Sequence, residues 1–217
     1  DEIGLIITHI DEKGFLWFEP IGGWDPQILV GQRVEVTGRE GIVPGVAGRK
    51  PIHLLEPDQR KKVVELKSMH IDIGAADREE AETKVRVGDP IVIRTEPMQV
   101  LGSRLVSKSM DNRLGAFVAL ESTRRCAEGK GPGGSMAGVA AVQEEIGLFG
   151  ARTAAFELRP DIAVAVDVTH ATDAPGVDAT EVGVHPLGSG PAIGRGSTLS
   201  PKVFALLVES AEAEAIE

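Results

Sequence analysis

The fold class depends on residues 148–168, which read LFGARTAAFELRPDIAVAVDV. The first part of this stretch predicts a helix over Leu148–Leu158. The second part, Ile162–Val168, is an apolar run broken by one acidic residue near its end, and it predicts a buried strand. A helix followed at once by a buried strand is typical of α/β proteins.

The same alternation extends toward the N-terminus. Leu114–Arg124 is predicted to be a helix and Gly138–Val142 a strand. Apolar strands that alternate with helices are usually covered on both faces and parallel. The second half is therefore predicted to be α/β, with a mixed, largely parallel sheet flanked by helices.

Before about residue 100 the pattern changes to that of a small β-rich unit. Short alternating or β-branched runs predict strands at Ile3–Thr8, Arg33–Thr37, Val63–Lys67 and Pro90–Arg94. Residues 41–51, GIVPGVAGRKP, are rich in glycine and proline and predict a mobile loop. The chain thus combines two units of different class.

Composition excludes several kinds of partner. The 217 residues have 23 Lys and Arg against 33 Asp and Glu, a formal net charge of −10 that repels nucleic acid and anionic membranes. The single cysteine, Cys126, excludes an internal disulfide and fits a reducing compartment, so we expect a cytoplasmic protein. No apolar run approaches the roughly 18 residues that span a bilayer.

Acidic residues follow the predicted strands and precede the predicted helices of the second half. They are Asp111 in SKSMDNRLGAF, Glu144 and Glu145 in VQEEIGLFGA, and Asp167 in VAVDVTH. In open α/β sheets such positions meet at the carboxyl ends of the strands. Because clustered carboxylates repel unless cations neutralise them, a metal site is predicted there.

These motifs carry a resemblance. SKSMDNRLGAFVALE, VQEEIGLFGA, DVTHATDAPGVD and GSGPAI resemble the M42 family of dinuclear metallo-aminopeptidases, the glutamyl aminopeptidase and TET group. THIDEKGFLWFEPIGGWD, VPGVAGRKPIHLL and HIDIGA resemble the inserted domain of that family. The resemblance implies a zinc-peptidase-like catalytic domain at residues 1–4 and 99–217, interrupted by a β-rich dimerisation domain at 5–98.

The resemblance also implies roles for single residues. Asp111 would bridge two divalent ions, zinc or cobalt, while Glu145 and Asp167 would each bind metal. Glu144 would be the general base. Asp1 resembles the residue that hydrogen-bonds a first histidine ligand, which this chain lacks, as it lacks a last one.

The function implied is a metal-dependent aminopeptidase that acts on peptide substrates, in dimers that assemble into dodecamers. The C-terminal helix begins at the cap Ser200 with Pro201 next, but it meets no stop signal before Glu217. We therefore expect a chain truncated at both ends and inactive by itself. The alternatives are an endoglucanase-like glycoside hydrolase and a non-catalytic assembly homologue with a vestigial site.

Several residues also have plainer interpretations. Asp111 could cap the following helix, and the paired glutamates could be solvated carboxylates at a helix start. His9 and His70 lie in the β-rich half and are not expected to bind metal, whereas His170 could support the site. Cys126 is expected to pack against its neighbours. A cluster of apolar residues is expected to form a homodimer contact, and its members are Ile21, Trp24, Ile28 and Leu29.

Overall fold

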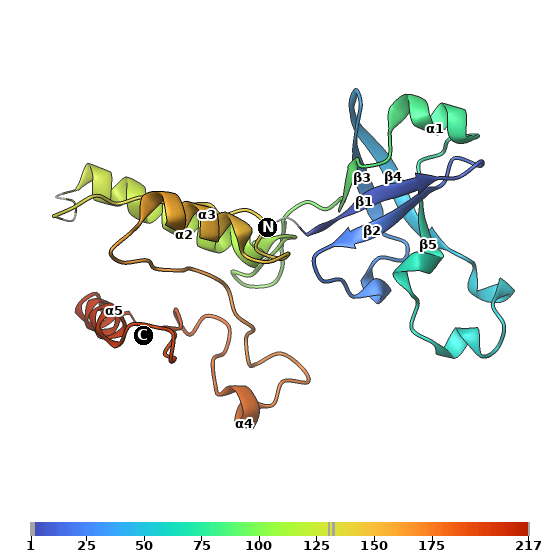
Figure 1. The fold of residues 1–217 in the computed structure, drawn as a ribbon. Coiled ribbons are helices and arrows are strands. Elements are labelled where there is room, and N and C mark those ends of the chain that lie inside the picture. Colours follow the sequence, from blue (N-terminus) through green and yellow to red (C-terminus); the bar gives the residue numbers. More distant parts are fainter. Residues whose placement is uncertain (1–2, 130, 132, 217) are drawn as a thin grey trace. The chain divides into compact units, whose positions relative to one another are not determined.

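The structure is a computed structural model that describes residues 3–129, 131 and 133–216 (Figure 1). The chain forms two compact units, Asp1–Val168 and Thr169–Glu217. The division predicted from the sequence, at residues 5–98, stays a prediction. Among the described helices, none is long and apolar enough to cross a membrane.

Six strands of the first unit form a closed antiparallel barrel in the order β1-β2-β5-β4-β3-β6. The strands are β1 (Gly4–Ile10), β2 (Leu16–Ile21), β3 (Arg33–Gly38), β4 (Gly41–Arg49), β5 (Met69–Asp72) and β6 (Pro90–Ile93). Three of the four strands predicted from β-branched runs are confirmed, as β1, β3 and β6. Closure removes the exposed strand edges that an open sheet would present.

Alternation along the strands fills the barrel. Inward-pointing side chains recur along the strands, apart from an irregularity in β1 after Ile7, and the core includes Leu5, Ile7, Leu16, Val34, Val36, Met69, Ile71 and Ile91. Helix α1 (Arg78–Lys84) lies between β5 and β6, with Asp77 as its cap, whose carboxylate accepts from the Glu80 N–H at 2.9 Å. Short 3-10 helices occupy the connections at Pro26–Ile28, Ile52–Leu54, Gln59–Lys61 and Leu66–Ser68.

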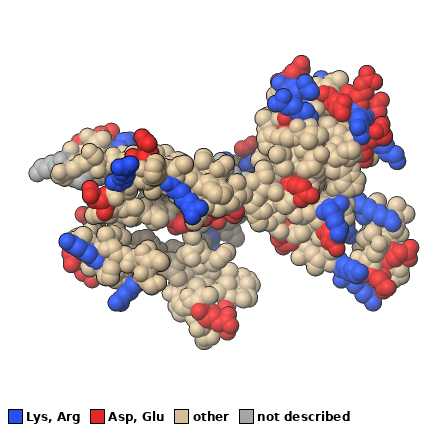
Figure 2. Space-filling view, in the orientation of Figure 1, with Lys and Arg blue, Asp and Glu red and all other residues tan. Residues whose placement is uncertain are grey.

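The connection between β4 and β5 carries a basic surface on an otherwise acidic chain. Its exposed lysines and arginine are seen over this segment in Figure 2, and they are Lys50, Arg60, Lys61, Lys62 and Lys67. Lys67 pairs with Glu65 at 2.7 Å, an exposed ion pair of small energetic weight.

Two sequence predictions in this region were wrong. Residues 41–51 were predicted to be a loop, but most of them form β4, and residues 63–67, predicted to be a strand, form no strand. Pro44 is tolerated in β4 because pairing with β5 begins only at Val46. The N–H that proline lacks therefore breaks no hydrogen bond to β5. The glycines serve close packing: a Cβ on Gly45 would lie 2.8 Å from Ile71 Cγ2.

We therefore expect Gly45→Ala to destabilise the barrel by about 1–3 kcal/mol, because the new methyl group must displace Ile71 or the strand. Gly23→Ala is the matched control, since nothing lies within 4 Å of its added Cβ. Urea denaturation should give a lower midpoint for Gly45→Ala with an unchanged slope. Equal midpoints for the two variants would contradict the packing argument.

The apolar cluster expected to form a dimer contact is only partly on the surface. Leu29 is fully buried in the core, and Trp24 packs on that core while its indole N–H donates to Gly4 O at 2.9 Å. Ile28 is 51% exposed. The predicted surface position is therefore wrong for Leu29, whose side chain the barrel interior takes up, while the homodimer contact stays a prediction.

The rest of the chain contains helices joined by long segments without regular secondary structure. A two-stranded sheet of β7 (Met98–Gln99) and β8 (Leu105–Val106) precedes four helices, α2 (Met110–Glu128), α3 (Phe149–Leu158), α4 (Ala179–Val182) and α5 (Pro201–Ala213). The predicted helices are confirmed in α2 and α3. Ser200 also caps α5 as predicted, accepting from Val203 N at 3.4 Å.

Charged pairs stabilise the C-terminal half of α2. Glu121 accepts hydrogen bonds from Arg124 and Arg125, one turn further along the helix, and these bonds lower the pKa of Glu121 to about 2. Such pairs are the usual local support of a helix with an exposed surface. These pairs matter here because, among the described residues of α2, Gly115 alone is buried.

The two strands predicted in the second half are absent from the described residues. Residues 138–142 and 162–168 form no strand, and every described strand pair is antiparallel, so the largely parallel sheet is not confirmed. A strand requires a neighbouring backbone. Val166 O instead accepts from the Asn112 side chain, and Val164 is 57% exposed. The structure does support the coarser class, a fold of both helices and strands.

Candidate metal and catalytic site

Asp111 lies at the start of α2, where the backbone is not yet helical and the Asp111-Asn112 peptide bond is cis. Its carboxylate is exposed, and no described residue donates a hydrogen bond to it. The capping interpretation of Asp111 is therefore wrong. Asn112 has that role, since its Oδ1 accepts from Gly115 N at 2.8 Å.

Asn112 also makes a long-range contact that was not predicted from the sequence. Its Nδ2 donates to Val166 O at 2.8 Å, across 54 residues of sequence. One side chain thus ties the helix start that carries Asp111 to the segment that carries Asp167. Gly115 permits this contact, because a Cβ there would collide with Asn112 Oδ1 and Val166 O. An asparagine directly after the candidate ligand was the signal available in the sequence.

Glu144 and Glu145 lie in a turn that leads into α3. The carbonyl of Glu144 accepts from Gly147 N and Leu148 N, each at 3.1 Å. Glu144 is exposed and Glu145 half-buried. A Cβ on Gly22, just after β2, would lie 3.3 Å from Glu145 Cβ, so the end of the barrel strand partly covers this residue. Among the described residues, neither carboxylate forms an ion pair or hydrogen bond, which leaves both available for chemistry.

Asp167 was predicted to be buried at a strand end, and this was wrong. The residue is exposed, and its Oδ1 accepts from Val168 N at 2.8 Å. The apolar run before it is not enclosed by neighbouring strands in the described residues, which is why the carboxylate remains at the surface.

The predicted ligands do not form a complete cluster. Within the part of the chain that the structure describes, no three His, Cys, Asp or Glu side chains are grouped so that they could hold a metal ion. Asp1 lies outside the described residues. Carboxylates at Asp111, Glu145 and Asp167 suit a divalent ion chemically, but the described geometry is not an assembled site. Their role as ligands stays a prediction.

The histidines of the barrel have structural surroundings. His70 packs edge-on against Phe15, with ring centroids 4.8 Å apart. Next to His9, burial acts to raise the pKa of Asp11, but hydrogen bonds from Trp17, Phe15 and Lys13 hold that pKa below its usual range. Asp11 therefore organises the β1–β2 turn. His170 is exposed, and Cys126 is a free, half-buried thiol.

Comparison with known proteins identifies the family. A family model described as M42 glutamyl aminopeptidase matches residues 1–217. The chain belongs to the M42 family. It is 40% identical over 215 residues to a putative aminopeptidase of Acetivibrio thermocellus, covering 98% of this chain and 61% of the relative. It is 35% identical over 206 residues to the lysyl aminopeptidase of Pyrococcus furiosus, covering 94% and 58%. This M42 chain thus spans about three-fifths of the length of these relatives.

Solved structures agree with the family. The TET aminopeptidase of Thaumarchaeota archaeon SCGC AB-539-E09 matches with a TM-score of 0.91 at 39% identity, covering 100% of this chain and 62% of that chain. The TET1 peptidase of Pyrococcus horikoshii, described as assembling into a tetrahedron or a large octahedral shell, matches at 0.82 and 32% identity, covering 100% and 64%. A structure named endoglucanase from Thermotoga maritima matches at 0.68 and 27%, covering 99% and 62%.

Proposed function

We propose that this M42 protein is a metal-dependent aminopeptidase that removes N-terminal residues from peptides. The observation that carries the proposal is the family match over all 217 residues. The names of its relatives support it, because they include a lysyl and a glutamyl aminopeptidase.

We propose that two divalent ions, zinc or cobalt, are held by Asp111, Glu145 and Asp167 together with further ligands. When bound, such ions supply electrophilic polarisation of the attacking water and of the scissile carbonyl. The protein's own base is Glu144, which takes the proton of that water and returns it to the leaving amine. Its exposure and its lack of a described ion-pair partner leave this carboxylate free to accept a proton.

We also propose a cytoplasmic homo-oligomer, dimers assembling into a dodecamer, with peptides as the substrates. The assembly of the TET relatives supports the oligomer. The acidic net charge of −10 is consistent with a protein that binds neither nucleic acid nor membranes.

Substrate panels test the proposed reaction. The test uses a longer polypeptide that contains residues 1–217 and has the full length of the M42 relatives. With zinc or cobalt it should hydrolyse amides of leucine, lysine or glutamate. Chelation of the metal should abolish this turnover. β-Glucan should not be cleaved. Cleavage of glucan with no amide hydrolysis would favour the endoglucanase alternative, and failure on both substrate classes would favour the non-catalytic homologue.

The 217-residue chain by itself is expected to bind zinc weakly and to show no amide turnover. The reason is that its described residues assemble no group of three metal donors, and incomplete coordination loses both affinity and geometry. Metal content after dialysis and hydrolysis of leucine amide measure both properties. Robust hydrolysis by the purified 217-residue chain would contradict this prediction.

A further inference from the structure

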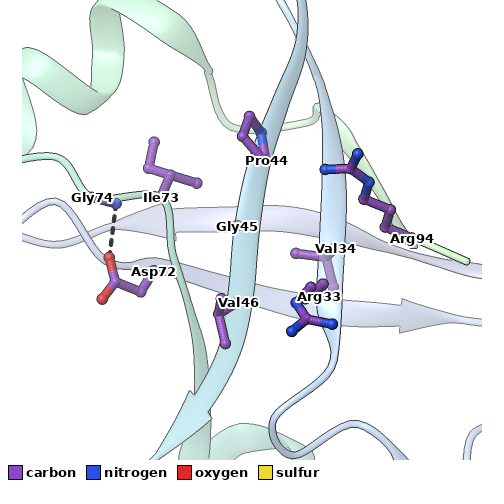
Figure 3. Close-up of a pocket in the computed structure, with 9 residues that line it drawn as sticks. All are labelled: Arg33, Val34, Pro44, Gly45, Val46, Asp72, Ile73, Gly74 and Arg94. Carbon is purple, nitrogen blue, oxygen red and sulfur yellow. Dashed lines mark hydrogen bonds between the residues drawn. The ribbon is translucent and has the colours of Figure 1, made fainter.

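The outer face of the barrel carries a hollow of about 400 Å³ that has no place in the proposed reaction (Figure 3). Its walls come from β3, β4, the end of β5 and the segments that follow β5 and β6. The lining residues are Arg33, Val34, Pro44, Gly45, Val46, Asp72, Ile73, Gly74 and Arg94. The volume is at the small end for ligand sites, so a small molecule fits it better than a macromolecular segment does.

Strand register places opposite charges at the two ends of this hollow. Arg33 on β3 is the cross-strand partner of Val46 on β4, and Val46 is in turn the partner of Asp72 on β5. Directly opposite residues of an antiparallel pair point to the same face. Figure 3 shows Val46 between Arg33 and Asp72. The three residues therefore form a row that is cationic at one end, apolar in the middle and anionic at the other.

The cationic end of the hollow can bind an anion. The backbone N–H of Arg94 donates to the backbone oxygen of Arg33 at 2.8 Å, which makes the two arginines cross-strand neighbours. Like charges in such positions destabilise a sheet. Glu35 approaches Arg94 at 3.5 Å. No carboxylate of the described residues lies within ion-pair distance of Arg33. An anion bound here would pair with Arg33 and accept hydrogen bonds from its guanidinium.

The anionic end is fixed in place. Asp72 accepts from the Gly74 N–H at 2.8 Å through Oδ1, which orients the carboxylate and leaves its second oxygen free. Between the charged ends, Val46 is 47% exposed, and Pro44 and Ile73 also line the hollow. This apolar surface suits an aliphatic side chain.

We propose that this hollow binds a free α-amino acid with an aliphatic side chain, its carboxylate on Arg33 and its ammonium on Asp72. Strands two apart lie roughly 10 Å from each other. A bound amino acid would form one charge-assisted hydrogen bond of about 2.8 Å at each end. With the distance between its own nitrogen and carboxylate oxygen added, the total span is about 9 Å. A dipeptide would be longer by roughly 3.5 Å. This backbone spacing accommodates one amino acid, and because the Arg33 side chain is long, it is the small volume of the hollow that favours an amino acid over a longer peptide. The proposal does not depend on the proposed function, although such a ligand is the product of that reaction.

A titration of the ¹⁵N-labelled 217-residue chain tests the proposal directly. L-Leucine should cause saturable shifts of the Gly45, Val46 and Gly74 amides, with a Kd of about 1 mM. L-Leucinamide lacks the carboxylate and 4-methylpentanoate lacks the ammonium, and each should bind about tenfold more weakly. Equal binding of all three compounds, or no saturable leucine shift up to about fifty times the expected Kd, would overturn the proposal.

Two variants assign the charged ends. Arg33→Gln should abolish the preference for leucine over leucinamide, whereas Asp72→Asn should abolish the preference over 4-methylpentanoate. Asparagine can still accept from Gly74, so the turn is preserved. Arg39→Gln, which removes the same charge outside the hollow, should bind leucine normally. The same spectra show whether each variant is folded, and a folded variant that keeps both preferences contradicts the site.

Discussion

Glu144→Gln is expected to lower kcat by roughly 10²–10⁴-fold while the bound metal stays near normal, the loss expected when a general base is removed. The measurement is made on a polypeptide that carries residues 1–217 within the full M42 length. Glu145→Gln, its neighbour, is expected to lose metal, and with it activity that excess zinc or cobalt partly restores. The physical reason is that a carboxylate committed to a metal has no lone pairs for a proton, whereas a free one can accept it.

The structure gives this contrast a local basis. Glu144 is exposed, while Glu145 is half-buried beside Gly22, so the two adjacent carboxylates have different surroundings. Glu157→Gln, an exposed position on α3, is the control for loss of one negative charge. Metal analysis and titrated activity distinguish the outcomes. Metal loss in Glu144→Gln with retention in Glu145→Gln would reverse the assignment, and normal turnover in both would place the site elsewhere.

Ile71→Ala is expected to destabilise the barrel by about 2–5 kcal/mol. Ile71 is fully buried on β5, pairs with Leu16 on β2 and Ala47 on β4, and packs against Gly45. Truncation leaves a cavity that neighbouring strands of a closed barrel cannot collapse to fill. Since native domains are stable by only about 5–15 kcal/mol, the loss is a large fraction of the total.

Tryptophan fluorescence during urea denaturation measures this effect selectively. The chain has two tryptophans, Trp17 and Trp24, and both lie in the barrel region, so the signal reports barrel unfolding rather than changes in the helices. Ile28→Ala is the matched control, because that isoleucine is 51% exposed. An Ile71→Ala midpoint close to that of Ile28→Ala would show that the barrel core tolerates the cavity and would contradict the prediction.

The two segments whose secondary structure was wrongly predicted have a common feature. Residues 41–51 have the composition of a loop, yet most of them form β4, because Gly45 allows Ile71 to approach and β3 supplies the partner backbone. Residues 162–168 have the composition of a strand, yet the described residues offer no adjacent strand to pair with them. In both cases pairing partners distant in sequence outweigh local composition.

Local sequence was enough to predict α2, α3 and the start of α5, together with the candidate chemistry. These helices depend on contacts and caps within a few residues, such as Ser200 at the start of α5. The candidate chemistry depends on residue types that the sequence itself contains, at Asp111, Glu144, Glu145 and Asp167. The closure of the barrel, the burial of Leu29 and the hydrogen bond from Asn112 to Val166 could not be predicted from local sequence. These features join residues far apart in sequence, and their free energy exists only after the chain has brought them together.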